Sequence, residues 1–341
     1  MSVYGNMMLE NNKSIIDISN EMTEICAEFT GYNNFFNEFI IESNIQITNE
    51  GVGETIKTVF TKIKDFIKSI IDKIREFISS LFNSNKKNKT KEKDQKAKEA
   101  IKQLDKYELI PLGNSSVSTD AKTIKNVKIG SVKRFAPLFK EIFKASEIAV
   151  KECKNNTSLA KSVLSSMPNM VHQIDDPILS DKKDALNQVY DELSGNIVQM
   201  AEQLTRLRYN PKDIEIIGEN GTLADFKKLP SNIKQELLTG ISYYKETSKK
   251  YSNEIQKQME ELYNFITEME KKSKSLVSNI DSSNASSVAL QPYVKIPNMI
   301  GKEVTNVNKL LPIYSTIITQ FENQRDRILN AIKISKLSFR N

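Results

Sequence analysis

The sequence predicts a mainly α-helical protein, a bundle of long helices with minor β pieces. Three observations support this prediction: the 341 residues include only 11 Gly and 9 Pro, 27% of them are charged, and apolar residues recur at helical spacing over long stretches. A hydrophobic fraction of 39% is enough to form a core in a chain of this length. The pattern divides the chain into three parts, residues 1–50, 51–106 and 107–341.

The first part has the pattern of a helical hairpin followed by a hinge. Apolar residues recur at helical spacing over 13–29, and a second short apolar run covers 35–41 after the turn sequence "GYNN". The segment "ESNIQITNEGVG" then interrupts the periodicity with asparagines and two glycines. We expect a hinge there.

The second part begins with a long amphipathic helix over about 54–82. Its apolar residues alternate at four-residue and three-residue spacing from Ile56 to Leu81, and further apolar residues widen the stripe. We call these residues the apolar stripe. Such a face cannot stay in water alone, so we expect protein to cover it. The residues expected inside are Phe60, Ile63, Ile67, Ile70, Ile74 and Phe77.

The net charge of +6 is concentrated in this second part, where residues 57–106 include fifteen basic and seven acidic side chains. After Asn83 the run "NSNKKNKTKEKDQKAKEA" contains almost no large apolar residue. Burial therefore cannot offset the entropy of ordering it, and the composition predicts a solvated linker or a frayed helical extension. The lysines of this basic segment are Lys86, Lys87, Lys89, Lys91, Lys93, Lys96 and Lys98.

Three kinds of partner stay open for the second part. The apolar stripe can pack into the bundle or against a copy of the chain, which leaves the lysines solvated. Its Phe and Ile residues beside a basic face also fit an anionic membrane surface, although Trp is absent and four acidic residues between Glu54 and Glu76 weaken the attraction. The lysine run, which lacks aromatic residues and arginine, fits a sequence-independent and salt-sensitive contact with DNA.

The third part opens with an irregular crossover over 107–134, where short β-like runs stand among Pro and Gly residues. Helical periodicity returns from about Pro137 and again over 181–209. Prolines and an Asn-Gly pair then interrupt it, which allows a small hairpin over 214–223. Ser231 is the expected cap of the next helix.

The last segments predict two long helices that pack antiparallel. Residues 231–276 are periodic, as one helix or as two with a break near Gly240. A Ser-rich connector over 277–297, with one short strand, leads to a returning helix over 300–334 that bends at Pro312. Long consecutive helices of this kind bury their apolar faces against each other.

Catalytic residues are not indicated. The single histidine, His172, lies near Ser165, Ser166, Asp175 and Asp176, but closeness in sequence does not make a triad. The motifs GxSxG, HExxH, GxGxxG and the P-loop are absent. We therefore expect an ordinary loop or helix-end histidine and a protein that is not an enzyme.

No metal or cofactor is expected either, because Cys26, Cys153 and one histidine cannot form a zinc site and no EF-hand spacing occurs. The two cysteines lie far apart and outside any CxxC pair, which predicts two reduced, partly buried thiols. The N-terminal residues lack the pattern of a signal peptide, and no run of about 18 apolar residues predicts a transmembrane span.

The hairpin, the sequence "FIIESNIQITNEGVGETI" and the following Ile/Phe/Lys helix resemble internal or structural virion proteins of tailed bacteriophages with low-GC hosts. The resemblance covers about the first hundred residues. It implies a non-enzymatic virion protein that assembles with other virion proteins or with itself and lies near DNA. A membrane-active helical protein, ejected or toxin-like, is the alternative that the amphipathic helix allows.

The resemblance also implies proteolytic processing. In several such phages a prohead protease cuts after Glu in an Ile/Leu-x-Glu context, and "IIE" places this pattern at Glu42, before the hinge. Cleavage there would make the hairpin a propeptide. The same pattern ends at Glu76, Glu219 and Glu268, whereas "TNE" at 48–50 departs from it.

Overall fold

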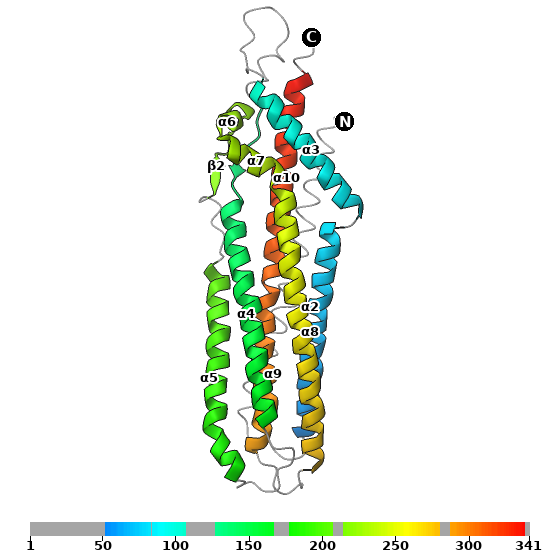
Figure 1. Ribbon diagram of the computed structural model, residues 1–341, viewed down its shortest axis with the longest axis vertical. Coiled ribbons are helices and arrows are strands. Elements are labelled where there is room, and N and C mark those ends of the chain that lie inside the picture. The colour runs from blue at the N-terminus through cyan, green and yellow to red at the C-terminus, as the bar shows by residue number, and fades with distance from the viewer. Residues whose placement is uncertain are drawn as a thin grey trace, which may run out of the picture. The chain divides into compact units, whose positions relative to one another are not determined.

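The computed structural model describes residues 52–82, 84–106, 127–166, 177–206, 214–279 and 287–337, and these residues are mainly α-helical (Figure 1). The expected fold class is thereby confirmed. The hairpin and hinge expected within 1–50 lie outside the described residues. The helices are α2 (Val52–Phe82), α3 (Ser84–Lys106), α4 (Ala136–Ser166), α5 (Pro177–Arg206), α6 (Leu223–Lys228), α7 (Ser231–Thr239), α8 (Ile241–Asn279), α9 (Ser287–Asn308) and α10 (Leu310–Leu337).

The described residues form two compact units, each built from segments that are distant in sequence. Unit 1 takes its described residues from Met1–Ile74, Ala145–Thr205 and Asn253–Pro312. Unit 2 takes them from Arg75–Lys144, Arg206–Ser252 and Ile313–Asn341. Several of the long helices therefore contribute residues to both units. The division of the sequence at residues 50 and 106 stays a prediction.

Unit 1 is a bundle in which polar contacts link neighbouring helices around an apolar core. Lys64 of α2 forms an ion pair with Glu270 of α8, with 2.5 Å between Nζ and Oε2. Lys272 of α8 donates from Nζ to the backbone oxygen of Leu164 in α4, at 2.7 Å. Asn306 of α9 donates to the backbone oxygen of Ile197 in α5, at 3.2 Å. Each of these contacts joins helices that enclose buried apolar side chains.

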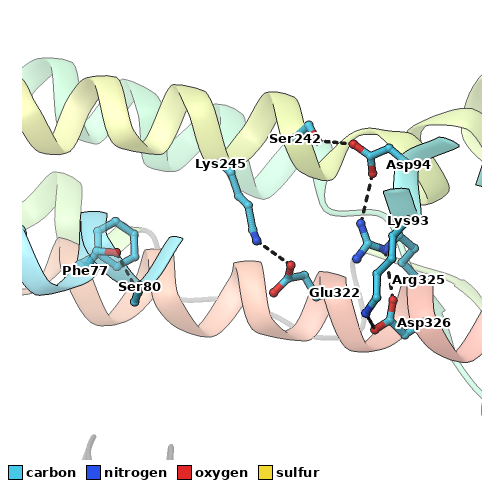
Figure 2. Close-up of polar contacts among 9 residues, drawn as sticks. All are labelled: Phe77, Ser80, Lys93, Asp94, Ser242, Lys245, Glu322, Arg325 and Asp326. Atoms are coloured by element: carbon cyan, nitrogen blue, oxygen red, sulfur yellow. Dashed lines mark hydrogen bonds and ion pairs between the residues drawn. The ribbon is translucent and has the colours of Figure 1, made fainter. Parts of the chain in front are cut away.

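Unit 2 has an aromatic core between α4, α8 and α10. The rings of Phe139 and Tyr244 stack with centroids 4.1 Å apart, and Phe321 lies 5.9 Å from Tyr244. Lys245 of α8 pairs with Glu322 of α10 at 2.7 Å (Figure 2). Three residues earlier in α8, Ser242 bonds the same Asp94 carboxylate as Arg325, which lies three residues later in α10. The two helices therefore run in opposite directions. The expected antiparallel packing of these two segments is therefore confirmed in this unit.

The small sheet joins segments far apart in sequence. Strand β1 (Val132–Lys133) pairs antiparallel with β2 (Glu215–Ile217), and Thr222 bridges Lys128. The local hairpin expected over 214–223 is thus wrong, because these residues find their partner in 128–133. Gly221 comes close to this partner: a Cβ there would lie 2.6 Å from the oxygen of Gly130, so only glycine fits.

A side chain extends this pairing on the α10 side. The amide of Gln324 accepts a hydrogen bond from the backbone nitrogen of Lys133 at 2.7 Å and donates one to its oxygen at 2.8 Å. The amide side chain thereby bonds to the backbone of β1 as a neighbouring strand would, and it holds Lys133 in place shortly before α4 begins at Ala136.

The basic segment is helical, which corrects the expected linker. Residues 84–106 form α3, so the alternative of a helical extension is the one observed. The expected cap at Ser231 is also wrong: Pro230 occupies the N-cap of α7 without a side-chain hydrogen bond, and Ser231 is the first helical residue. The expected break at Gly240 is confirmed, since α7 ends at Thr239 and α8 begins at Ile241.

Two further corrections concern prolines. The expected Ser-rich connector is wrong over 287–297, where α9 runs helically through Pro292 and Pro297 with both side chains buried. Near Pro312 the chain breaks rather than bends, because α9 ends at Asn308 and α10 begins at Leu310. Pro312 has no N–H to donate to the carbonyl of Asn308, four residues earlier, which favours the interruption observed between the two helices.

Candidate functional site

The apolar stripe of α2 is buried by protein. Phe60, Ile63, Ile67, Ile70 and Ile74 are 0% exposed, and Phe77 is 9% exposed. The alternating four-residue and three-residue spacing places them on one face of the helix, while Lys57, Lys62 and Lys68 are exposed on the other. These six side chains are thus buried within the described part of the chain, and their role as interaction residues stays a prediction.

The basic helix α3 divides into a buried face and an exposed face. Ala97, Ala100 and Leu104 are 0%, 4% and 4% exposed. The side chains of Lys91, Lys96, Lys98 and Lys102 are exposed, whereas those of Lys86, Lys87 and Lys89 lie outside the described side chains. Because two of these three residues are alanines, apolar burial contributes less to holding this helix than it does along α2.

Polar contacts attach α3 to the rest of unit 2. Asp94 accepts hydrogen bonds from Arg325 Nη1, 3.2 Å from its Oδ1, and from the hydroxyl of Ser242 (Figure 2). Lys93 pairs with Asp326, which also accepts from Arg325 Nε at 3.3 Å. We call these five residues the polar latch: Lys93, Asp94, Ser242, Arg325 and Asp326.

The latch holds a buried arginine whose charge must be compensated. Arg325 is 1% exposed and is the largest fully buried side chain among the described residues. Burial raises the pKa of the Asp94 carboxyl, and the Ser242 hydroxyl and the Arg325 guanidinium oppose that shift. Removing Asp94 would leave the buried guanidinium with Asp326 as its carboxylate partner in the latch, and removing Arg325 would leave Asp94 partly buried without its cation. Periodicity could not reveal this contact, because Asp94 reads as one more charge in a solvated run.

A second polar group is buried in unit 1. Glu303 of α9, 1% exposed, lies beside Cys153 and Asn156 of α4. Burial raises the pKa of Glu303 to about 7, contacts with Cys153 and Asn156 oppose the shift, and Glu152 adds to it. Asn196 of α5 donates to Asn156 at 2.8 Å. The carboxyl is therefore neutral at mildly acidic pH, and the expected buried thiol is observed at Cys153.

The remaining sequence candidates form no site in the described residues. Ser165 donates to the backbone oxygen of Ser162 near the end of α4, while His172, Asp175 and Glu42 lie outside the described residues. Within the described part of the chain, no group of three or more metal-ligating side chains is assembled. None of the described helices is long and apolar enough to cross a membrane.

We expect Ile67→Asp to lower the free energy of unfolding by about 3 kcal/mol or more, because the carboxylate would enter a fully buried position without a partner. Urea denaturation followed by circular dichroism measures the change. Thr61→Asp, on the exposed face of the same helix, introduces the same charge and should change stability by less than about 0.5 kcal/mol. If Ile67→Asp kept full stability and instead lost binding to anionic vesicles, the stripe would be a membrane face.

We expect Glu303→Gln to flatten the pH dependence of stability. A carboxyl with a folded pKa of about 7, above its ordinary 4.5, favours the folded state below pH 4.5 and loses this contribution as the pH rises to 7. The wild-type loss is on the order of 3 kcal/mol over that range. Unfolding measured from pH 4.5 to 8 should show a smaller decline for the variant, whereas exposed Glu268→Gln should follow the wild type. Parallel curves for all three proteins would contradict the neutral buried carboxyl.

Comparison with known proteins adds one match. Residues 38–171 match the family model of the phiKZ-like phage internal head proteins. No curated protein and no solved structure matches the chain. The matched segment includes α2, α3 and α4 and covers less than half of the chain. Over residues 38–171 this match confirms the resemblance to internal virion proteins of a phage.

Proposed function

We propose that the chain is a non-enzymatic structural protein inside a phage head, where it packs with other virion proteins or with itself and contacts DNA through α3. The observation that carries this proposal is the match of residues 38–171 to phage internal head proteins. The matched segment contains both the apolar stripe and the basic segment. A location in the virion, after assembly in the host cytoplasm, follows from the same proposal.

The exposed face of α3 supports the DNA contact. Lys91, Lys96, Lys98 and Lys102 project from a helix that the polar latch attaches to unit 2. Lysines that neutralise phosphates release counterions, which gives affinity without base recognition. A protein packaged with a whole genome has no need for a particular sequence, so this kind of contact fits the proposed location.

The membrane alternative requires a rearrangement that the DNA contact does not. The apolar face of α2 is covered by protein, whereas membrane insertion needs that face against lipid. Each large apolar side chain of the stripe contributes about 1.5 to 3 kcal/mol when buried, while each lysine near an anionic surface contributes about 1 kcal/mol. Because lipid would bury the same stripe, the membrane gains only the lysine attraction, and this must offset the cost of opening the packed helices.

Mass spectrometry of purified source particles tests the location. We expect peptides from the chain in particles that have been washed and treated with nuclease, and a new N-terminus after Glu42 if the hairpin is a propeptide. Recovery of intact Met1 to Asn341 from mature particles would contradict processing alone. Absence of all peptides from the particles would contradict the proposed function.

Binding to double-stranded DNA tests the contact. We expect log K to fall linearly with log salt. The combined variant Lys91→Gln, Lys96→Gln, Lys98→Gln should bind more weakly, and its slope should be smaller by about 0.9 for each phosphate that the protein no longer neutralises. Fluorescence anisotropy over a salt series measures both quantities.

The matched control removes three exposed lysines from other helices, Lys57, Lys140 and Lys151, each replaced by Gln. It should keep the wild-type slope. An equal loss of affinity in both triple variants would mean that net charge, rather than α3, is responsible. Binding of the wild type to anionic vesicles but not to DNA would favour the membrane alternative.

A further inference from the structure

The lysines of α3 are not equivalent in position. An α-helix turns by about 100° for each residue, so Lys91, Lys98 and Lys102 lie within about 40° of one another along one side. All three side chains are exposed, and the series extends over about 16 Å. We call these three residues the lysine stripe. Lys93 lies outside it, because it points towards α10 and pairs with Asp326.

Acidic residues mark the other exposed side of the helix. Glu92 and Glu99 are exposed on the flank that carries Lys96, where their charges offset part of its attraction for an anion. Between Lys91 and Lys102 the remaining acid is Asp94, whose carboxylate is held by Arg325 and Ser242 and also attracts Lys98. The flank of the lysine stripe is therefore the more positive of the two.

The polar latch determines which flank faces outward. The small buried side chains Ala97 and Ala100 give little resistance to rotation of α3 about its axis, and Leu104 adds one larger buried side chain near the end of the helix. Asp94 resists it strongly, because its two oxygens accept from Ser242 on α8 and Arg325 on α10, two separate helices (Figure 2). A rotated α3 would leave the guanidinium of Arg325 buried without Asp94.

We propose that the lysine stripe is the part of α3 that contacts DNA phosphates, and that Asp94 is its positioning residue. This inference rests on the proposed function. A helix held at one angle presents its three lysines together, whereas a helix free to turn must be ordered when it binds. Asp94 thus promotes binding to an anion although its own charge is negative.

Removal of the Asp94 charge should weaken DNA binding, whereas removal of an ordinary negative charge should strengthen it, and this difference gives the decisive experiment. Asp94→Asn and Glu92→Gln each remove one negative charge from α3, so simple electrostatics predicts equal or tighter DNA binding for both. We expect Glu92→Gln to follow that rule and Asp94→Asn to bind about tenfold more weakly, with a salt slope close to that of the wild type. Fluorescence anisotropy with a double-stranded oligonucleotide measures both.

The lysine stripe is tested in the same assay. Replacing Lys91, Lys98 and Lys102 by Gln should reduce the salt slope by about 0.9 for each phosphate left without its lysine, whereas Lys96→Gln should leave the slope nearly unchanged. Hydrogen exchange supplies a readout that does not involve DNA: the amides of α3 should exchange faster in Asp94→Asn and as in the wild type in Glu92→Gln. Ser242→Ala is the milder variant if Asp94→Asn fails to fold, with a smaller change in the same direction.

Three outcomes would overturn the inference. Tighter binding by Asp94→Asn, with Lys-to-Gln variants still weakened, would reject the positioning role and leave the proposed DNA contact intact. If Lys96→Gln reduced the salt slope as much per lysine as the variant of the lysine stripe does, the assignment of the DNA contact to the stripe would be rejected. Absence of DNA binding by the wild-type protein would reject the proposed contact itself, whatever hydrogen exchange reports for the latch.

Discussion

The apolar face of α2 must be removed from water, and much of the fold follows from that constraint. Buried side chains recur from Val59 to Leu81, so protein must cover the helix over nearly its whole length. Other long helices supply such a surface: Lys64 of α2 pairs with Glu270 of α8, and the ring of Phe77 stacks on Tyr314 of α10. The Lys64–Glu270 ion pair lies at the edge of this buried face, where its charges stay partly hydrated.

Periodicity predicts those features that depend on neighbours along the chain. The six residues of α2 that were expected inside the protein are buried, and the break at Gly240 occurs where the helical pattern is interrupted. Pairing across the chain leaves no such signal. Strand β2 pairs with residues about 80 positions earlier, and α9 continues through two buried prolines although each removes a backbone donor. Local propensity alone therefore predicted a hairpin over 214–223, which is wrong, and a connector that is wrong over 287–297.

The sequence likewise predicts only part of the candidate site. The lysines of the basic segment were visible in the composition, but the division of α3 into two faces depends on contacts made by a few residues. Asp94 and Arg325 are separated by 231 positions, and each resembles an ordinary surface charge in its own sequence context. Glu303 follows a glycine and a lysine in α9 and likewise has no pattern that marks it as buried. Such residues become recognisable only when the helices are assembled.

The two units solve the same desolvation problem in different ways. In unit 1 protonation of Glu303 avoids the cost of burying a charge, because a neutral carboxyl with Cys153 and Asn156 beside it needs no counter-ion. In unit 2 the guanidinium of Arg325 cannot lose its charge, so it requires carboxylates, and one of them comes from the otherwise solvated helix α3. A proton can leave a buried site without moving the backbone, whereas Asp94 can leave only together with its helix. Compensation of Arg325 therefore ties the attachment of α3 to the stability of unit 2, and this is why a helix with so little apolar surface has a defined face.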